Sequence, residues 1–555
     1  MLDDVPGRGG RFTNDPAFAT LEAAYEAFLE AWGRWMVGHH RGAPLDPADD
    51  EAGLATRLVE ARRAVDAALA AVADRRAGLA AADSTALANI RAALPDLDAW
   101  APPLDGWAGE AASARASGEG AAARASGEPG EASEDATTTT LRREVFDAWG
   151  AAMAAIELDG ERLDRLTVTK QLASIDDPET RRRLFLAMAP AWTIVGGDGG
   201  VDSPYRRLVR SSSATWARNG SPIEQNAAGL GLDPTAVEPT MRRILRTWRA
   251  VAMPAGLVEP WDYRFHTGAL GRRADPLLPV ERLRGINDGH LAALGADPIA
   301  LGIEYDIRPR PGRPVIPTAF TTSIGSCRRA DDGSWRSSRP WVFATYAEGG
   351  LGNLEELLHE SGHAIHYAAV RARPAHFELP PEATAFGEAF ADVVGWSTTE
   401  PAFLAEHLGL EVDRRDALRE RYGGVMLDAC WTLFELELHR HPERPPNEVW
   451  AEIAERELGV AGHPEWAWWA HRGQLIDGPG YLANYALGAI LVAAVRARIR
   501  DLRGDWSRGD PGWYSFVSDR LLRWGGARST ASVVAEFLGG PLSVEPLLVD
   551  LRAAA

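Results

Sequence analysis

The chain has 555 residues, of which 46% are hydrophobic, and it carries a formal net charge of −19. Its length allows a large buried core, and its acidic balance argues against a nucleic-acid partner, which would require basic patches. Two cysteines, Cys327 and Cys430, are too few for a disulfide framework, and we expect both thiols to be buried in a reducing compartment.

The N-terminal region, residues 1–107, has the pattern of amphipathic helices. One apolar face at helical spacing is formed by Leu54, Leu58, Ala61, Val65, Ala68 and Val72. Residues 1–6 lack the basic start and apolar stretch of a secretory signal, and the aliphatic run near residues 485–495 is too short to span a bilayer. We therefore expect a cytoplasmic protein without a membrane partner.

Residues 108–140 differ sharply in composition from the rest of the chain. They are almost wholly Ala, Gly, Ser, Glu, Arg and Thr, and they contain the string ARASGE twice, at 114–119 and 123–128. Such a stretch cannot bury enough apolar surface to offset its ordering entropy. We predict a disordered insertion here, followed by a helical region over 141–310.

The last region, residues 311–555, contains the residues that indicate chemistry. Extended patterns are scarce in the whole chain, and the clearest are 315–322 and 341–346. We therefore predict a mainly α protein with one small β-sheet.

The segment His359-Glu360-Ser361-Gly362-His363 is the strongest chemical signal in the chain. On an α-helix, His359 and His363 lie one turn apart on the same face and can both reach one metal ion. Glu360 points about a quarter-turn away, where it can act on a water molecule without binding the ion. His366 need not face the metal, and we expect it to have a structural or substrate-side role.

Two acids downstream are candidates for a third ligand, Glu382 and Glu388. Metal-bound histidines usually donate their other ring N–H to a carboxylate. Asp392, one turn after Glu388, could accept that hydrogen bond from His359 or His363, which favours Glu388 as the ligand. Glu382 follows two prolines and is more typical of a residue that opens a helix.

Two histidines and a glutamate leave one coordination position open, as catalytic zinc sites do. We predict one Zn²⁺ per chain, with Glu360 as the general base that takes a proton from water and returns it to a leaving amine. Each residue alone also fits an ordinary solvated helix face. Their grouping within 359–392 at two helical spacings favours the metal site.

The oxyanion formed in such a reaction needs a hydrogen-bond donor, and residues 480–488 offer two. Tyr481 and Tyr485 lie one helical turn apart, so both hydroxyls could face one cavity. Spacing alone favours the alternative, a pair of half-buried aromatic residues in a core helix. His471 is a weaker candidate donor.

Several blocks of the sequence resemble zinc metallopeptidases of the M3 family, of the thimet oligopeptidase and oligoendopeptidase F type. A wider likeness extends to peptidases related to angiotensin-converting enzyme. From Asp176 onward the resemblance covers about two-thirds of the chain. Its blocks are 317–321 (PTAFT), 339–346 (RPWVFATY), 359–366 (HESGHAIH), 388–392 (EAFAD), 434–439 (FELELH) and 485–488 (YALG).

The resemblance implies a large helical protein of two lobes with a central cleft and a small sheet beside the HExxH helix. It also implies particular site residues, namely the zinc ligands His359, His363 and Glu388, the base Glu360, and Tyr481 and Tyr485 along the cleft. Residues 341–346 would form an edge strand, along which an extended peptide could lie.

The sequence departs from the family at one point. The family has a histidine shortly before its tyrosines, whereas residues 475–479 read LIDGP and His471 is out of register. The choice of oxyanion donor among Tyr481, Tyr485 and His471 therefore stays open.

Three functions are compatible with these features. The favoured one is zinc-dependent hydrolysis of peptide bonds in short peptides by an oligopeptidase or endopeptidase. A zinc carboxypeptidase or dipeptidase would need a cationic side chain that holds a terminal carboxylate, and the sequence does not place one. A non-catalytic helical binding protein is the third, but it would have no need of the general base Glu360.

Overall fold

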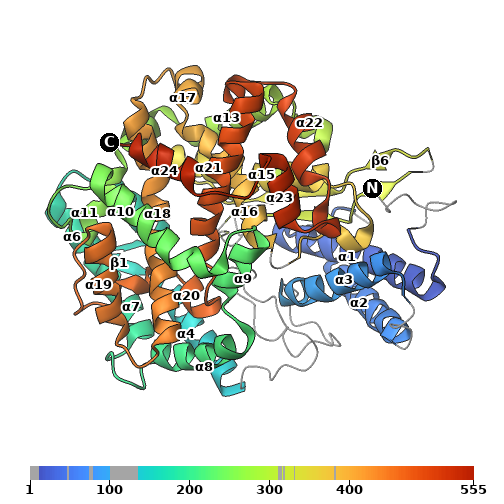
Figure 1. Ribbon diagram of the computed structural model, residues 1–555, viewed down its shortest axis with the longest axis horizontal. Helices are drawn as coiled ribbons and strands as arrows, with labels where there is room; N and C mark the ends of the chain where they lie inside the picture. Colours follow the sequence, from blue (N-terminus) through green and yellow to red (C-terminus); the bar gives the residue numbers. More distant parts are fainter. Residues whose placement is uncertain are drawn as a thin grey trace.

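The computed structural model describes residues 12–46, 49–73, 79–100, 136–310, 316, 319–330, 332–380 and 383–555. This part of the chain is built mainly from helices, which confirms the predicted fold class (Figure 1). None of its helices combines the length and apolar character that a bilayer crossing requires.

Three N-terminal helices lie together at one side of the molecule, where Figure 1 shows them in blue. Their bounds are α1 (Pro16–Arg41), α2 (Glu51–Ala73) and α3 (Ala81–Trp100). Helix α1 begins after Asp15, whose carboxylate accepts hydrogen bonds from the N–H groups of Ala17 and Phe18. The predicted apolar face of α2 is buried in a core that the three helices share, and of its six residues only Ala61 is partly exposed.

A second group of helices follows the N-terminal three. It comprises α4 (Ala136–Met153), α5 (Arg165–Ser174), α6 (Pro178–Ala187), α7 (Ala189–Gly196), α8 (Pro204–Asn219), α9 (Pro222–Gly229), α10 (Val237–Ala252), α11 (Pro260–Thr267), α12 (Ala269–Ala274), α13 (Val280–Ala293) and α14 (Pro298–Leu301). Residues 108–135, where we predict disorder, lie outside the described residues. The prediction is wrong for residues 136–140, which form the start of α4.

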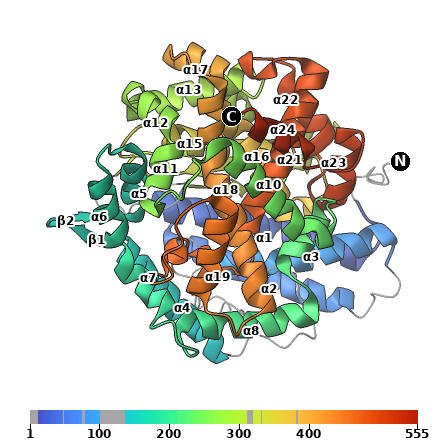
Figure 2. The ribbon, with the colours of Figure 1, turned by 60° about the vertical axis from the view of Figure 1, so that its left-hand side comes forward.

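The remaining helices surround the segment with the two histidines. They are α15 (Leu351–Ala369), α16 (Thr384–Gly395), α17 (Pro401–Leu408), α18 (Arg414–Arg440), α19 (Pro446–Ile453), α20 (Gln474–Asp477), α21 (Ala483–Arg503), α22 (Trp513–Val517), α23 (Thr530–Leu538) and α24 (Glu545–Arg552). Helix α18 runs through the middle of this body (Figure 2) and contacts α8, α10, α11, α12, α19 and α21.

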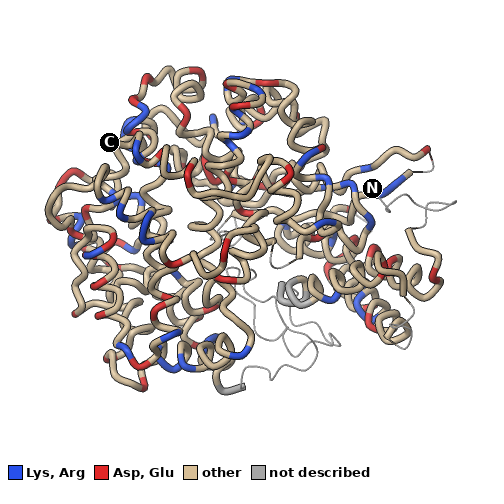
Figure 3. Tube along the Cα trace, viewed as in Figure 1, with Lys and Arg blue, Asp and Glu red and all other residues tan. Residues whose placement is uncertain are grey.

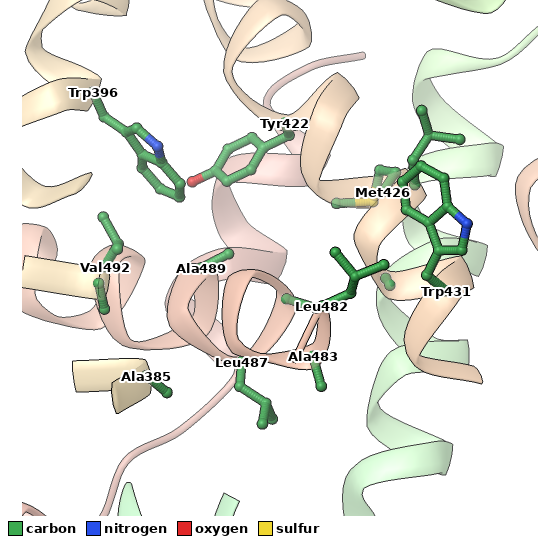
Figure 4. Packing of buried hydrophobic residues seen from close by; sticks show 14 of the residues in the cluster. Ala385, Trp396, Tyr422, Met426, Trp431, Leu482, Ala483, Leu487, Ala489 and Val492 are labelled. Carbon is green, nitrogen blue, oxygen red and sulfur yellow. The ribbon is translucent and has the colours of Figure 1, made fainter. Parts of the chain in front are cut away.

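The main hydrophobic core joins the second and third groups of helices. Figure 4 shows part of it, where Ala489 of α21 lies near Tyr422 of α18 and Leu482, just before α21, lies near Met426. The ring of Trp396 meets that of Tyr422 edge-on at 5.2 Å. Because α21 is buried on nearly all sides over residues 483–495, it gives the tyrosines at its N-terminal end a rigid support.

The strands form one three-stranded sheet and two short hairpins. The sheet has the order β3 (Glu304–Asp306), β7 (Arg339–Phe343) and β4 (Phe320–Ile324), and the hairpins pair β1 (Ile156–Leu158) with β2 (Glu161–Leu163) and β5 (Arg328–Arg329) with β6 (Trp335–Arg336). Strand β7 runs parallel to β3 and antiparallel to β4. The expected edge strand at 341–346 is therefore wrong, because β7 is hydrogen-bonded on both sides. Its outer neighbours β3 and β4 are the edges.

A buried ion-pair network joins the N-terminal helices to the rest of the molecule. Arg373 is 1% exposed and donates hydrogen bonds to Glu22 of α1 at 2.6 Å and to Asp83 of α3 at 3.0 Å. Elsewhere, Figure 3 shows acidic and basic residues interleaved along the helices of all regions. In the described residues, charge of either sign is thus not confined to one segment.

Candidate metal centre

The start of helix α15 is fixed by two glycines and an acid. A Cβ atom on Gly349 would lie 1.8 Å from the carbonyl oxygen of Leu278, and Gly350 has a φ of +109°, a conformation that L side chains rarely adopt. The carboxylate of Asp275 accepts a hydrogen bond from the N–H of Leu351 at 2.8 Å. These contacts set where the helix with both histidines begins.

Helix α15 is also anchored on the face that points away from the histidines. The hydroxyl of Ser361 lies 2.8 Å from the side-chain oxygen of Asn287 in α13 and 2.9 Å from the hydroxyl of Tyr305 in β3. Ser361 is fully buried. The sheet and α13 therefore hold the helix through polar contacts that are specific in direction.

Helices α15 and α16 approach so closely that their backbones touch. A Cβ atom on Gly362 would lie 2.7 Å from the Cα of Ala391, and one on Gly395 would lie 3.4 Å from the Cβ of His359. Only a residue without a side chain fits at Gly362 without a shift of the neighbouring backbone. This contact brings Glu388 of α16 opposite the two histidines of α15.

The three predicted ligands come together. The Nε2 atoms of His359 and His363 are 3.2 Å apart, and the carboxylate of Glu388 lies 3.5 Å from the first and 4.0 Å from the second. All three donor atoms lie within 4.8 Å of one another. Each side chain is about a fifth exposed, at 17%, 21% and 21%, so the group is open to solvent on one side. We call these residues the metal triad.

Asp392 lies where the sequence predicts it. Its carboxylate accepts a hydrogen bond from Nδ1 of His359 at 2.7 Å, which leaves Nε2 of that ring facing the triad. Burial lowers the pKa of His359, but the carboxylates of Asp392 and Glu388 more than offset this effect and raise its pKa well above the usual value. The acids thus create a negative potential that favours a cation. Glu382, the alternative ligand, lies outside the described residues.

The second histidine has the protonation state of a ligand. Burial lowers the pKa of His363 to about 4, so its imidazole is neutral near pH 7 and has a free electron pair. Glu388 remains ionised, because the hydrogen bond with His359 and the nearby imidazoles outweigh burial and hold its pKa well below the usual value. Two imidazole nitrogens and one carboxylate are the donor set of a catalytic zinc site.

Glu360 lies beside the triad and is held by a residue that sequence reasoning did not identify. The hydroxyl of Thr321 in β4 lies 2.7 Å from a carboxylate oxygen of Glu360 and 2.9 Å from its backbone carbonyl oxygen. Burial raises the pKa of Glu360 to about 7. Thr321 falls within the family-like block 317–321, and that block was the available signal, but nothing in the spacing pairs it with Glu360.

A cavity of about 190 Å³ adjoins this part of the site. Strand β4 contributes Phe320, Thr321, Thr322 and Ser323 to its wall, and helices α1 and α3 also line it. The remaining lining residues are Tyr367, Glu378 and Leu379. An edge strand therefore lines a cavity that reaches the hydrogen-bond partner of Glu360.

Tyr481 and Tyr485 lie on the Glu388 side of the triad. The hydroxyl of Tyr481 is 3.5 Å from a carboxylate oxygen of Glu388, and the two tyrosine rings meet edge-on at 5.7 Å. Burial raises the pKa of both phenols above the usual value, so both keep their protons near pH 7. They are thus available as hydrogen-bond donors.

The other candidate residues lie apart from the triad. His471 is buried, its ring nitrogen is 3.5 Å from the hydroxyl of Thr169, and burial with nearby arginines lowers its pKa. His366 is buried edge-on against Phe386 and Phe390, which fits the structural role. The predicted burial of the cysteines is confirmed, since Cys327 and Cys430 are free thiols that are 1% and 0% exposed.

No family model matches the sequence, and no curated protein matches it. Solved structures do share its fold. The M32 carboxypeptidase from Deinococcus radiodurans R1 has a TM-score of 0.55 at 14% identity, over 97% of this chain and 98% of its own. Trypanosoma cruzi metallocarboxypeptidase 1 has a TM-score of 0.52 at 14% identity, over 96% and 97%. A protein described as an oligoendopeptidase F has a TM-score of 0.51 at 16% identity, over 96% and 95%.

In each of these three comparisons the structural likeness covers nearly the whole length of both chains. At such low identity the likeness concerns the fold and not the activity. The same fold is found in proteins named for carboxypeptidase activity and in one named for oligoendopeptidase activity. The chain therefore has the large, mainly α fold of these peptidases.

Proposed function

We propose that the protein hydrolyses peptide bonds in short peptides with one Zn²⁺ held by His359, His363 and Glu388. The observation that carries the proposal is the convergence of these three donors on one point, with the carboxylate of Glu360 beside them. The donor set fits zinc, because it combines two imidazole nitrogens with one carboxylate and stays open on one side. Asp392 would orient His359, as carboxylates commonly do at metal sites.

Zinc held by such a set polarises a carbonyl group and makes water a better nucleophile near neutral pH. Glu360 would accept the proton of the attacking water on its carboxylate and pass it to the nitrogen of the leaving amine. A pKa of about 7 suits this exchange, since a group that both takes and gives a proton works best near the operating pH. The hydroxyl of Thr321 would hold the carboxylate in place during both transfers.

The phenols of Tyr481 and Tyr485 would stabilise the oxyanion of the tetrahedral intermediate. Their raised pKa values keep the hydroxyl protons in place, and Tyr481 already reaches the oxygen of Glu388. Donors that are fixed before the reaction begins cost no reorganisation in the transition state. His471 is less suited to this role, because its described contact is with Thr169.

Strand β4 would bind the backbone of an extended peptide. It is an edge of the sheet, it lines the 190 Å³ cavity, and it contains Thr321. A peptide that pairs with this edge would lie across the site next to Glu360. We therefore propose that the peptide lies along β4 and not along residues 341–346, where the sequence analysis expected it.

Purified protein tests the proposal directly. We expect about one zinc ion per chain by mass spectrometry of metals. Wild type should cleave members of a mixed library of short peptides, and Glu360→Gln should lower turnover about 10²- to 10⁴-fold with zinc retained. The matched control is Glu281→Gln, at an exposed position of α13. Full activity of Glu360→Gln would contradict the role of Glu360 as the base. Zinc bound without any cleavage by wild type would contradict the peptidase function and favour a binding protein.

A further inference from the structure

The cavity of about 190 Å³ beside strand β4 is walled by parts of the chain that are held firmly together. The indole N–H of Trp32 in α1 donates a hydrogen bond to the backbone carbonyl oxygen of Leu97 in α3 at 3.0 Å, and both residues line the cavity. Helix α1 also touches β4, since a Cβ atom on Gly33 would lie 2.3 Å from the carbonyl oxygen of Ser323. The walls are therefore fixed relative to one another. We call this space the β4 cavity.

The wall of the β4 cavity is mainly apolar. Its apolar lining residues are Trp32, Met36, Ala93, Leu97, Phe320 and Leu379. Three of them, Met36, Ala93 and Leu97, are 2%, 7% and 8% exposed and belong to the core of the N-terminal helices. None of the described lining residues is a lysine or an arginine, whereas Glu378 adds a carboxylate. An uncharged apolar group thus suits the cavity, and an anion would be buried there without a cation.

The volume of the β4 cavity fits one side chain. Pockets that enclose a whole drug-sized ligand measure roughly 300–1,000 Å³, so a cavity of about 190 Å³ is too small for an entire peptide. An apolar cavity of about 150 Å³ is large enough to hold a benzene ring. The β4 cavity can therefore take a group of the size of an aromatic ring.

Thr321 places the β4 cavity next to the proposed base. It lines the cavity, and its hydroxyl lies 2.7 Å from a carboxylate oxygen of Glu360. Tyr367, one helical turn after His363 in α15, lines the cavity as well. A peptide paired with β4 would present every second side chain to the same face, at intervals of about 7 Å. A side chain close to the bond that is cut would thus be able to enter the cavity.

We propose that the β4 cavity binds a large apolar side chain of the peptide substrate, with phenylalanine as the best fit, and so determines specificity. This inference rests on the proposed function, because it takes β4 as the strand along which the peptide lies. The ring of the substrate would be buried among Trp32, Leu97 and Phe320. The carboxylate of Glu378 would exclude acidic side chains from the same place.

The test compares short peptides that differ in one side chain. The reference is acetyl-hexa-alanine amide, and its variants carry one Phe, Glu, Gln or Lys at each position in turn. Binding is measured by calorimetry on the full-length Glu360→Gln protein, with zinc and after its removal. Ala93→Leu is then added, because the longer side chain would occupy the space meant for the ring. Ala88→Leu, at an exposed position of the same helix, is the matched control.

We expect the best Phe peptide to bind about 10- to 100-fold more tightly than the alanine peptide, as for full burial of one large apolar side chain. Ala93→Leu should reduce this advantage to less than about 3-fold and leave binding of the alanine peptide unchanged. Ala88→Leu should keep the whole advantage. Thermal unfolding of each variant confirms that it is folded.

Glu378→Gln, at a partly exposed position, provides a second variant that does not depend on the folding of Ala93→Leu. At the position that Phe prefers, the Glu peptide should bind about 2- to 5-fold more weakly than the Gln peptide, as for charges near the surface. Glu378→Gln should remove this difference. A difference that stays unchanged in Glu378→Gln counts against the proposal.

Equal binding of the Phe and alanine peptides, a Phe advantage that survives in folded Ala93→Leu, or tighter binding of Lys than of Phe overturns the proposal. Hydrolysis by wild type is scored separately, and the cleaved bond should stay at a fixed distance from Phe as Phe moves along the peptide. A Phe advantage without any cleavage supports the cavity and refutes the peptidase function. Cleavage without a Phe advantage refutes the role of the cavity alone.

Discussion

Two junctions of the molecule are built in different ways. Between α15 and α16, which hold the metal triad, small residues let the backbones touch, as at Gly362 and Ala391. Between the N-terminal helices and the rest, long charged side chains meet, as Arg373 does with Glu22 and Asp83. Backbone contact at the first junction sets the distances between the residues of the triad. Ion pairs at the second junction hold the N-terminal helices to the rest of the molecule.

The difference shows which parts of the fold determine the chemistry. Side-chain rotamers can absorb a shift at the charged junction, whereas a shift between touching backbones moves every ligand that they carry. We therefore expect changes at the first junction to alter metal binding. Changes at the second should alter stability and leave metal binding intact.

Removal of the arginine at the charged junction should have the largest effect on stability. Arg373→Ala leaves two buried carboxylates without their cation, which should cost about 3–5 kcal/mol of the free energy of unfolding. The measurement is urea denaturation, with zinc content determined in parallel. Arg34→Ala removes a surface pair with Glu30 and should cost less than about 1 kcal/mol. Loss of zinc from folded Arg373→Ala would break the distinction between the junctions.

A methyl group at the backbone junction should disturb the metal site itself. In Gly362→Ala the new Cβ would lie 2.7 Å from the Cα of Ala391, so the helices must separate. We expect a loss of about 1–3 kcal/mol in stability, as for other overpacked cores, together with weaker zinc binding. Zinc affinity is measured by competition with a chelator.

Gly352→Ala supplies the matched control in the same helix, since nothing lies within 4 Å of a Cβ at that position. It should leave zinc affinity unchanged and raise stability by up to about 1 kcal/mol, because alanine is the better helix former. Equal zinc affinity in the two alanine variants would show that backbone contact does not set the ligand distances.

Truncation of the acid behind His359 should have a smaller and more local effect. Asp392→Ala removes the hydrogen bond to Nδ1 and should weaken zinc binding about 10- to 100-fold while the fold stays intact. Asp392→Asn keeps an acceptor for that N–H, so its zinc affinity should lie between those of Asp392→Ala and wild type. Unchanged affinity in Asp392→Ala would remove this residue from the site.

A buried acid that forms no ion pair with any residue of the described ranges extends the comparison of the two junctions to the pH dependence of stability. Glu435 is fully buried, accepts a hydrogen bond from the N–H of Gly480 at 2.6 Å, and has a pKa raised by burial from 4.5 to about 8. Between pH 4.5 and about 8, Glu435 thus keeps its proton in the folded state and loses it in the unfolded state. This contribution to stability is complete below pH 4.5 and is lost as the pH rises to about 8.

Glu435→Gln removes this titration, so its stability relative to wild type should rise steadily with pH across that window. Urea denaturation at several pH values measures the difference between the two proteins. A constant difference from pH 5 to pH 8 would show that Glu435 is ionised in the folded protein.

The sequence predicted those parts of the site that depend on local spacing. His359 and His363 are one turn apart in α15, and Glu388 and Asp392 are one turn apart in α16, so helix geometry alone places each pair on one face. The mainly α fold follows from the same periodicity. The partner of Glu360 could not be predicted in this way, because Thr321 comes from a strand whose position relative to α15 depends on tertiary packing.

Other features lacked a usable signal in the sequence. Strand β3 covers three residues, Glu304–Asp306, and a segment so short shows no alternation, although it turns β7 from an edge into a central strand. The start of α4 at Ala136 lies in a run of threonines, where composition suggested disorder.

In the proposed zinc site, the contact between Gly362 and Ala391 would also limit the size of the bound ion. Donor atoms on two helices whose backbones already touch cannot come closer together, and separation of the helices would break the packing around them. A large ion such as Ca²⁺ prefers six to eight oxygen ligands at longer distances, which this rigid nitrogen-rich pair of helices cannot supply. Preference of the proposed zinc site for a small cation would thus come from the packing of the two helices together with the ligands.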